Sequence, residues 1–143
     1  MTSYELIYDR FARKITDYVI LDLSDVDIED LCFGFLQSAI VKFKPITDNL
    51  TKRDDTLKTF LVDLLDVEIE ILACLMVVEW ITPQLNSTTY TNQFFGSKEE
   101  KFYAQKNQID GLRDMKKDMQ LEARKLRRNY ITDNSDYLKR SGG

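Results

Sequence analysis

The chain has 143 residues, of which 43 % are apolar and 31 % are charged, a balance typical of one soluble domain and not of a disordered segment. It contains only five glycines and two prolines. Since all-β folds need turn residues at short intervals, we expect few, long helices. The absence of histidine removes the commonest general base and the commonest metal ligand.

The charge is distributed unevenly. Residues 1–97 contain 8 Lys/Arg against 16 Asp/Glu, and residues 98–143 contain 12 Lys/Arg against 8 Asp/Glu. The net charges are therefore −8 and +4. This asymmetry predicts an acidic body with a basic C-terminal third.

A first helix is predicted from the N-terminus to about residue 18. Thr2 and Glu5 have the spacing of a capping box. Apolar residues then follow at steps of three and four, which is typical of one helical face. These residues are Tyr4, Ile7, Tyr8, Phe11, Ile15 and Tyr18.

A second helix is predicted to begin after Ser24 or Asp25 and to end before Pro45. Its apolar stripe consists of Ile28, Leu31, Cys32, Phe35, Leu36, Ala39, Ile40 and Phe43. Gly34 interrupts this stripe, which we interpret as a place where helices pack closely.

Residues 46–65 have no clear periodicity, and we expect a long surface connection. Phe60 and Leu61 should point inward, in a short strand or an apolar loop anchor. Asp54 and Asp55 are expected to be solvated carboxylates with no aromatic pocket nearby.

The run VEIEILACLMVVEWITPQ, residues 67–84, predicts an enclosed central helix that begins at Asp66. Its uninterrupted apolar part is eight residues, whereas a bilayer span needs about 20. Either the chain's own helices enclose this helix, or a second copy covers one side of it. Helical phase makes Glu68, Leu72, Leu75 and Glu79 one face, and these are our candidates for a subunit interface. Pro83 should end or kink the helix.

A long last helix is predicted from about residue 98 to 131, with Ser97 and Glu100 as a capping box. At about 1.5 Å per residue it would be roughly 50 Å long. Residues 131–143 are polar and are expected to be flexible or ordered by a partner. The predicted fold is all-α: a bundle of four to five helices in residues 1–130, followed by an extended tail.

The basic stretch RDMKKDMQLEARKLRRNY has three possible interpretations. Between residues 113 and 128 it holds seven Lys/Arg against three Asp/Glu. It could be an ordinary solvated face, a surface that docks onto an acidic protein (including a neighbouring copy), or a nucleic-acid contact. Duplex binding usually involves a clearly basic domain, and this chain is acidic overall.

The sequence does not predict an enzyme. It has no glycine-rich phosphate loop, no GxSxG motif and no cluster of metal-ligand residues. We therefore expect no catalytic, cofactor-binding or metal-binding residues. Cys32 and Cys74 lie in apolar runs without CxxC spacing, which indicates buried, reduced thiols.

The segments YELIYDRFARKITDY and EIEILACLMVVEWITPQLNS, followed by the long basic helix, form a pattern that covers most of the chain. This order resembles small helical proteins encoded in the virion-structure gene blocks of tailed bacteriophages. The type it resembles most is the head-to-tail adaptor, also called a connector or neck protein.

This resemblance implies a structural protein of the virion neck, assembled in the host cytoplasm, without a cofactor or membrane. It implies a ring of about a dozen copies beneath the portal protein, through which DNA passes without sequence-specific binding. Residues 113–143 would dock onto the portal, and residues 46–65 would line the channel or face the next neck or tail protein. The portal-docking candidates are Arg113, Lys116, Lys117, Arg124, Lys125, Arg127, Arg128, Tyr130 and Tyr137. The alternatives are another tail-completion or neck component, or a small helical nucleic-acid-binding regulator that uses residues 113–130.

Overall fold

The computed structural model describes residues 1–15, 25–43, 48–94 and 99–141. Of residues 25–27, 48, 86–94, 99–108 and 131–141 it describes the backbone alone. Helices make up 79 % of the described residues, which confirms the all-α prediction. Five helices and one small sheet follow in the order β1 (Thr2–Ser3), α1 (Tyr4–Lys14), α2 (Asp25–Lys42), α3 (Asp48–Thr51), β2 (Arg53–Asp54), β3 (Thr59–Phe60), α4 (Asp66–Phe94) and α5 (Glu99–Ser141).

Helix α1 is amphipathic as predicted, but its cap differs. The Ser3 hydroxyl accepts a hydrogen bond from the Glu5 backbone N–H at 3.2 Å, so Ser3 is the N-cap residue. Thr2 lies in β1, and its hydroxyl accepts instead from the backbone N–H of Leu64 at 2.9 Å. The predicted stripe is buried at Tyr4, Ile7, Phe11 and Ile15. Tyr18 lies outside the described residues.

Helix α2 buries most of the predicted stripe, including Leu36 and Phe43 with no exposed surface. Leu31 is 43 % exposed and lies outside the core. The interpretation of Gly34 was wrong, because a Cβ atom there would have no heavy atom within 4 Å. The predicted stop at Pro45 lies outside the described residues.

The connection between α2 and α4 is more ordered than predicted. Three short antiparallel strands form a sheet in the order β1-β3-β2, in which Thr2 pairs with Phe60 and Arg53 also pairs with Phe60. Phe60 is fully buried as expected, whereas Leu61 is 51 % exposed, so its predicted inward position was wrong. The sheet joins the N-terminus to the middle of the chain, a long-range contact that periodicity cannot reveal.

Helix α4 is the central element predicted from the apolar run, and it begins at Asp66 as expected. It does not end at Pro83 but continues to Phe94. Two side chains beside the proline donate to carbonyls of the preceding turn: Thr82 Oγ1 to Val78 at 2.8 Å and Gln84 Nε2 to Trp80 at 3.0 Å. These acceptors flank the carbonyl of Glu79, which is the one that Pro83 leaves without its helical amide donor.

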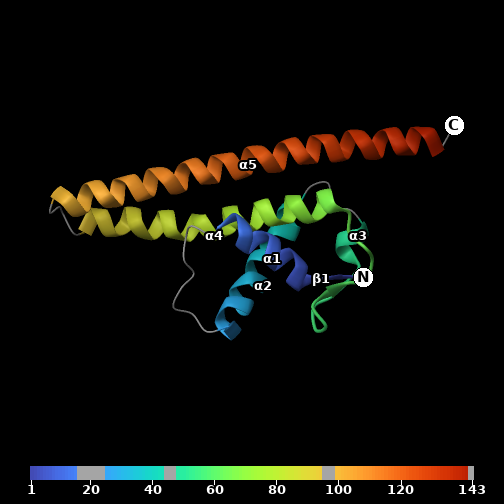
Figure 1. Cartoon of the computed structure of the whole chain (residues 1–143), viewed down its shortest axis with the longest axis horizontal. Helices are drawn as coiled ribbons and strands as arrows, with labels where there is room; N and C mark the ends of the chain where they lie inside the picture. The colour runs from blue at the N-terminus through green and yellow to red at the C-terminus, as the bar shows by residue number, and fades with distance from the viewer. Residues whose placement is uncertain (16–24, 44–47, 95–98, 142–143) are drawn as a thin grey trace.

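Helix α5 is 43 residues long, about 64 Å at the helical rise, and it lies antiparallel along α4 (Figure 1). It continues to Ser141, so residues 131–141 are helical and the expected extended tail was wrong for them. The start predicted at Ser97 lies outside the described residues. Helices α1 and α2 pack on α4 from the side away from α5 (Figure 1).

The core lies where α1, α2 and the first half of α4 meet. Within the described residues, no helix is long and apolar enough to cross a membrane. Both cysteines are free thiols and buried, as expected.

Candidate interaction surfaces

The basic side chains predicted to dock onto the portal lie along the second half of α5. Those of Arg113, Lys117, Arg124, Lys125 and Arg128 are exposed, and those of Lys116 and Arg127 are half-buried. The exposed cations therefore form a charged surface on the helix. The side chain of Tyr137 lies outside the described residues.

Tyr130 does not belong to this surface, because it is 5 % exposed and lies in the core. Its ring meets that of Phe43 edge to face, with centroids 6.0 Å apart and an interplanar angle of 88°. Its hydroxyl donates a hydrogen bond to the Glu68 carboxylate at 3.4 Å. This side chain holds α5 to the start of α4 and to the end of α2, so it is not available to a partner.

Glu68 is likewise fully buried by its own chain. Its carboxylate accepts from the backbone N–H of Leu65 at 2.9 Å, just before the helix begins. This contact satisfies one of the orphan amides of a helix start. Glu68 therefore joins two helices of one chain and is not accessible to a second copy.

The other candidates for a subunit interface divide between core and surface. Leu72 is fully buried, so the chain itself covers it. Leu75 is half-buried at the edge of the core. Glu79 forms an ion pair with Lys42 of α2. The face predicted from helical phase is thus covered mostly by the chain's own helices.

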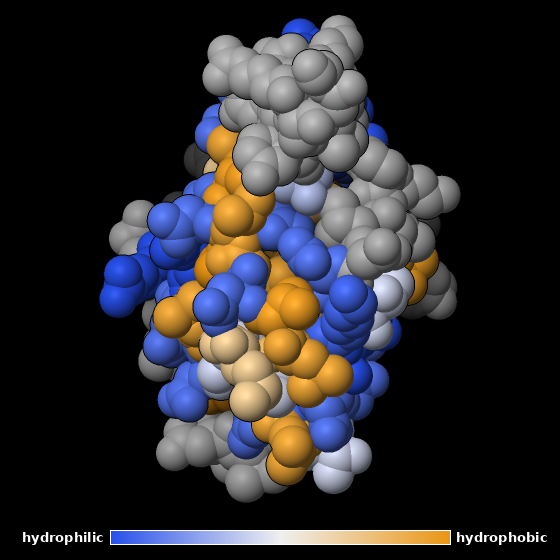
Figure 2. All heavy atoms as spheres, turned by 90° about the vertical axis from the view of Figure 1, so that its right-hand side faces the viewer, coloured by the Kyte–Doolittle hydropathy of each residue, from blue (hydrophilic) through white to orange (hydrophobic). Residues whose placement is uncertain are grey.

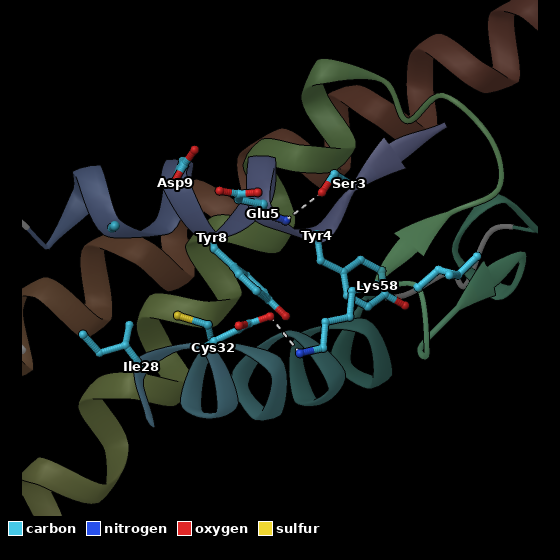
Figure 3. A pocket seen from close by; sticks show the side chains of 11 residues that line it. Ser3, Tyr4, Glu5, Tyr8, Asp9, Ile28, Cys32 and Lys58 are labelled. Carbon is cyan, nitrogen blue, oxygen red and sulfur yellow. Dashed lines mark hydrogen bonds and ion pairs between the residues drawn. The ribbon is translucent and has the colours of Figure 1, made fainter. Parts of the chain in front are cut away.

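A cavity of about 470 Å³ opens between α1, α2 and the turn that joins β2 to β3 (Figure 3). From α1 it is lined by Glu5, Tyr8, Asp9 and Ala12, which follow one another at helical spacing on one face. From α2 it is lined by Ile28, Glu29 and Cys32, and from the turn by Leu57 and Lys58.

The Tyr8 side chain points from α1 into this cavity, toward α2 (Figure 3). Its hydroxyl is buried and has no hydrogen-bond partner among the described residues. Burial, followed by nearby Cys32 and Glu29, raises its pKa well above the usual value, so the group remains a neutral hydroxyl. A buried hydroxyl without a partner is costly and rare in native structures.

The rim of the cavity is acidic. Glu5, Asp9 and Glu29 are exposed carboxylates, and Lys58 is the single basic residue in the lining. The Lys58 ammonium pairs with Glu29 at 2.8 Å and lies 5.9 Å from the centroid of the Phe33 ring. Within the described part of the chain, Glu5 and Asp9 form no ion pair. Two unpaired carboxylates one helical turn apart repel each other.

Asp55 is exposed, as expected, but the expectation that it has no aromatic neighbour was wrong. The Tyr4 hydroxyl donates a hydrogen bond to it at 2.5 Å, and Gln37 Nε2 donates at 3.0 Å. These donors, with Arg53 nearby, hold the pKa of Asp55 below its usual value. The opposite effect is seen at Tyr4, whose pKa is raised by burial and by its hydrogen bond to Asp55. No local pattern indicated this pair, because 51 residues separate its members.

Apolar side chains also gather on the end of the molecule that carries the N-terminus (Figure 2). The exposed apolar residues of this region are Met1, Leu57, Leu61 and Leu65. Three of them come from residues 46–65, which the resemblance places against a channel or another protein. Contiguous exposed apolar surface often marks a contact with another protein.

The described residues contain no group of three or more His, Cys, Asp or Glu side chains that could hold a metal ion. Burial raises the pKa of the Cys32 thiol and of the Cys74 thiol to about 11, which makes both poor nucleophiles. No family model matches the sequence, and no characterised protein or solved structure is significantly similar to it.

Proposed function

We propose that this chain is a structural adaptor of a tailed-phage neck, which forms a ring between the portal and the next neck or tail protein. The observation that carries the proposal is the projection of α5 beyond the body of the bundle. Tyr130 meets the start of α4, and residues 131–141 continue as helix past this point (Figure 1). A helix that extends beyond its own domain offers a surface for another protein.

The charge distribution supports the same function. Residues 1–97 carry a net charge of −8 and residues 98–143 one of +4, so copies or partners of opposite charge can be oriented before they touch. An acidic body also suits a channel for DNA, because a wall that bound phosphates tightly would slow its passage. The resemblance described above supplies the identity of the partners: the portal for residues 113–143, and the next neck or tail protein for residues 46–65.

The proposal is tested by mixing the purified chain with the purified portal protein of the same phage and measuring the mass of the complex by light scattering. We expect a ring of the chain and a stable complex with the portal. A variant that lacks residues 131–143 should keep its helical circular dichroism and lose the portal complex, since the described core side chains end at Tyr130.

A matched control separates docking from folding. Replacing Tyr130 by alanine should lower the thermal midpoint, because it removes a buried ring. A chain that stays monomeric, ignores the portal and binds duplex DNA with a steep salt dependence would contradict the adaptor function. That result would favour the nucleic-acid-binding regulator instead.

A further inference from the structure

We infer that the cavity between α1 and α2 is a receptor site for the basic pair Arg124–Lys125 of a second copy of this chain. This inference rests on the proposed ring and gives its subunit contact a location. The ligand is a guanidinium or ammonium group presented by a helix. The contact is head-to-tail, because the cavity and the basic pair lie on different surfaces of one protomer.

The cavity has the chemistry that a basic side chain requires. Glu5 and Asp9 form no ion pair within the described residues, whereas Glu29 at the opposite rim is already paired with Lys58. An incoming cation would relieve the repulsion between Glu5 and Asp9.

The second, independent feature is the Tyr8 hydroxyl, which is buried in the cavity and has no partner in the described part of the chain. Its oxygen is closed to solvent in the single protomer, so it accepts a hydrogen bond from an incoming guanidinium once the side chain rotates toward the cavity mouth. A group that is unsatisfied in one protomer is explained if a second protomer supplies its partner.

The basic pair has the complementary properties. Arg124 and Lys125 are exposed, and no ion pair is formed by either within the described residues. Residues 123–130 contain four basic residues and no acidic one, and the nearest carboxylate in the sequence is the exposed Glu122, one turn before Lys125. By contrast, Arg113 and Lys117 have Asp110, Asp114 and Asp118 close by in the sequence, which weakens their net charge.

One protomer cannot make this contact with itself. Helix α5 lies along one side of α4, whereas α1 and α2 lie on the other (Figure 1). Along the length of the molecule, however, α1 and α2 lie opposite the C-terminal half of α5, since Tyr130 meets Glu68. In a ring whose axis runs parallel to α5, the C-terminal half of the second copy's α5 lies at the level of α1 and α2. Such a head-to-tail contact can close into a ring.

The test uses two full-length charge reversals, Glu5→Lys/Asp9→Lys and Arg124→Glu/Lys125→Glu, with self-association measured by sedimentation. We expect each variant alone to associate roughly 100-fold more weakly, about a tenfold loss for each reversed charge pair. An equimolar mixture should recover association, because the reversed cavity then meets the reversed helix. Recovery also shows that both variants are folded. The matched control Arg113→Glu/Lys117→Glu should associate like the wild type.

The outcomes separate this inference from the proposed function. If the wild type forms a ring and Glu5→Lys/Asp9→Lys associates equally well, the cavity contact is wrong. The proposed adaptor function would not be affected by this result. A wild-type chain that remains monomeric at all concentrations overturns both. Tyr8→Phe should weaken association about tenfold, and an unchanged value would remove the hydroxyl from the contact.

Discussion

Two tyrosines one turn apart on α1 differ in their hydrogen bonding. The Tyr4 hydroxyl donates to Asp55 at 2.5 Å, and its ring packs edge-on against Phe60 with centroids 5.0 Å apart. The Tyr8 hydroxyl is buried without a partner among the described residues. Periodicity predicted that both rings face inward, but it could not distinguish them, because the partner of Tyr4 comes from a distant turn.

Removing the Tyr4 hydroxyl and removing the Tyr8 hydroxyl should change the free energy of unfolding in opposite directions. Tyr4→Phe should lower the free energy of unfolding by about 1 kcal/mol, since the hydrogen bond to Asp55 is lost. Tyr8→Phe should leave it unchanged or raise it by up to about 1 kcal/mol in the monomer, since an unsatisfied hydroxyl disappears. Urea unfolding of both variants at a concentration where the chain is monomeric checks this. Equal destabilisation by the two substitutions would contradict the assignment of partners.

The lowered pKa of Asp55 predicts an acid-dependent loss of stability. Hydrogen bonds, first from Tyr4 and then from Gln37, stabilise the carboxylate in the folded state. Its contribution is therefore fully present above the ordinary aspartate pKa near 4 and disappears as the pH falls through the lowered folded value. The difference in urea midpoint between wild type and Asp55→Asn should be largest near pH 6 and should shrink below about pH 4. If the difference in urea midpoint grew below pH 4 instead, the ionised Asp55 carboxylate would not be the form that stabilises the fold.

At the scale of elements, the sequence predicted the positions of the long helices and missed their ends. The apolar run correctly predicted α4, because eight consecutive apolar residues, all but Leu75 buried, dominate its pattern. Pro83 was a wrong guide to the helix end, because Ile81 and Leu85 on either side of it pack in or against the core and the helix continues. The small sheet was not predictable, since strands of two residues are too short to show alternation.

The Pro83→Ala variant should be more stable than the wild type. Position 83 is exposed and lies inside a helix, where proline costs up to about 3 kcal/mol relative to alanine. Because Pro83→Ala restores the amide donor for the Glu79 carbonyl, we expect a gain of about 1–2 kcal/mol in thermal or urea unfolding. Pro83→Gly serves as a control that also removes the ring and should gain less. A loss of stability in Pro83→Ala would show that the proline fits a bend that the packing requires.

Glu68 links α4 to α5 through its hydrogen bond with Tyr130. Substitutions of Glu68 should therefore lower the stability of the fold. Glu68→Ala leaves the Leu65 amide without this acceptor and removes the hydrogen bond from Tyr130. We expect a loss of about 2–3 kcal/mol in the free energy of unfolding. Glu68→Gln keeps an acceptor oxygen and should lose less. Equal losses in the two variants would indicate that the carboxylate charge, and not the acceptor geometry, is what matters.

At the scale of the whole molecule, composition predicted the charge asymmetry but not its arrangement in space. The acidic body and the basic helix follow from counting residues. The antiparallel packing of α4 on α5, which sets the basic face on one side and the acidic cavity on the other, required the structure. For the same reason Glu68, Leu72 and Tyr130 were predicted as contact residues although the fold buries them.

The reactivity of the two buried thiols should measure global unfolding of the helical bundle. Cys32 lies in α2 and Cys74 in α4, and burial raises the pKa of each to about 11. At pH 8 the folded protein should therefore react with a thiol reagent far more slowly than a free cysteine does. Adding urea should release both thiols together at the unfolding midpoint seen by circular dichroism. Stoichiometric reaction of either thiol in the native protein within seconds would contradict its burial.

The anchoring of α5 at Tyr130 makes the end of this helix a lever. Eleven helical residues beyond that anchor correspond to an arm of roughly 16 Å. A tilt of about 10° at the anchor would displace its tip by roughly 3 Å while the buried ring of Tyr130 moves very little. A neighbour that grips the tip can thus follow small angular changes between two assemblies. Where two stacked rings contain different numbers of subunits, such a tilt would let each arm adjust to the position of its neighbour.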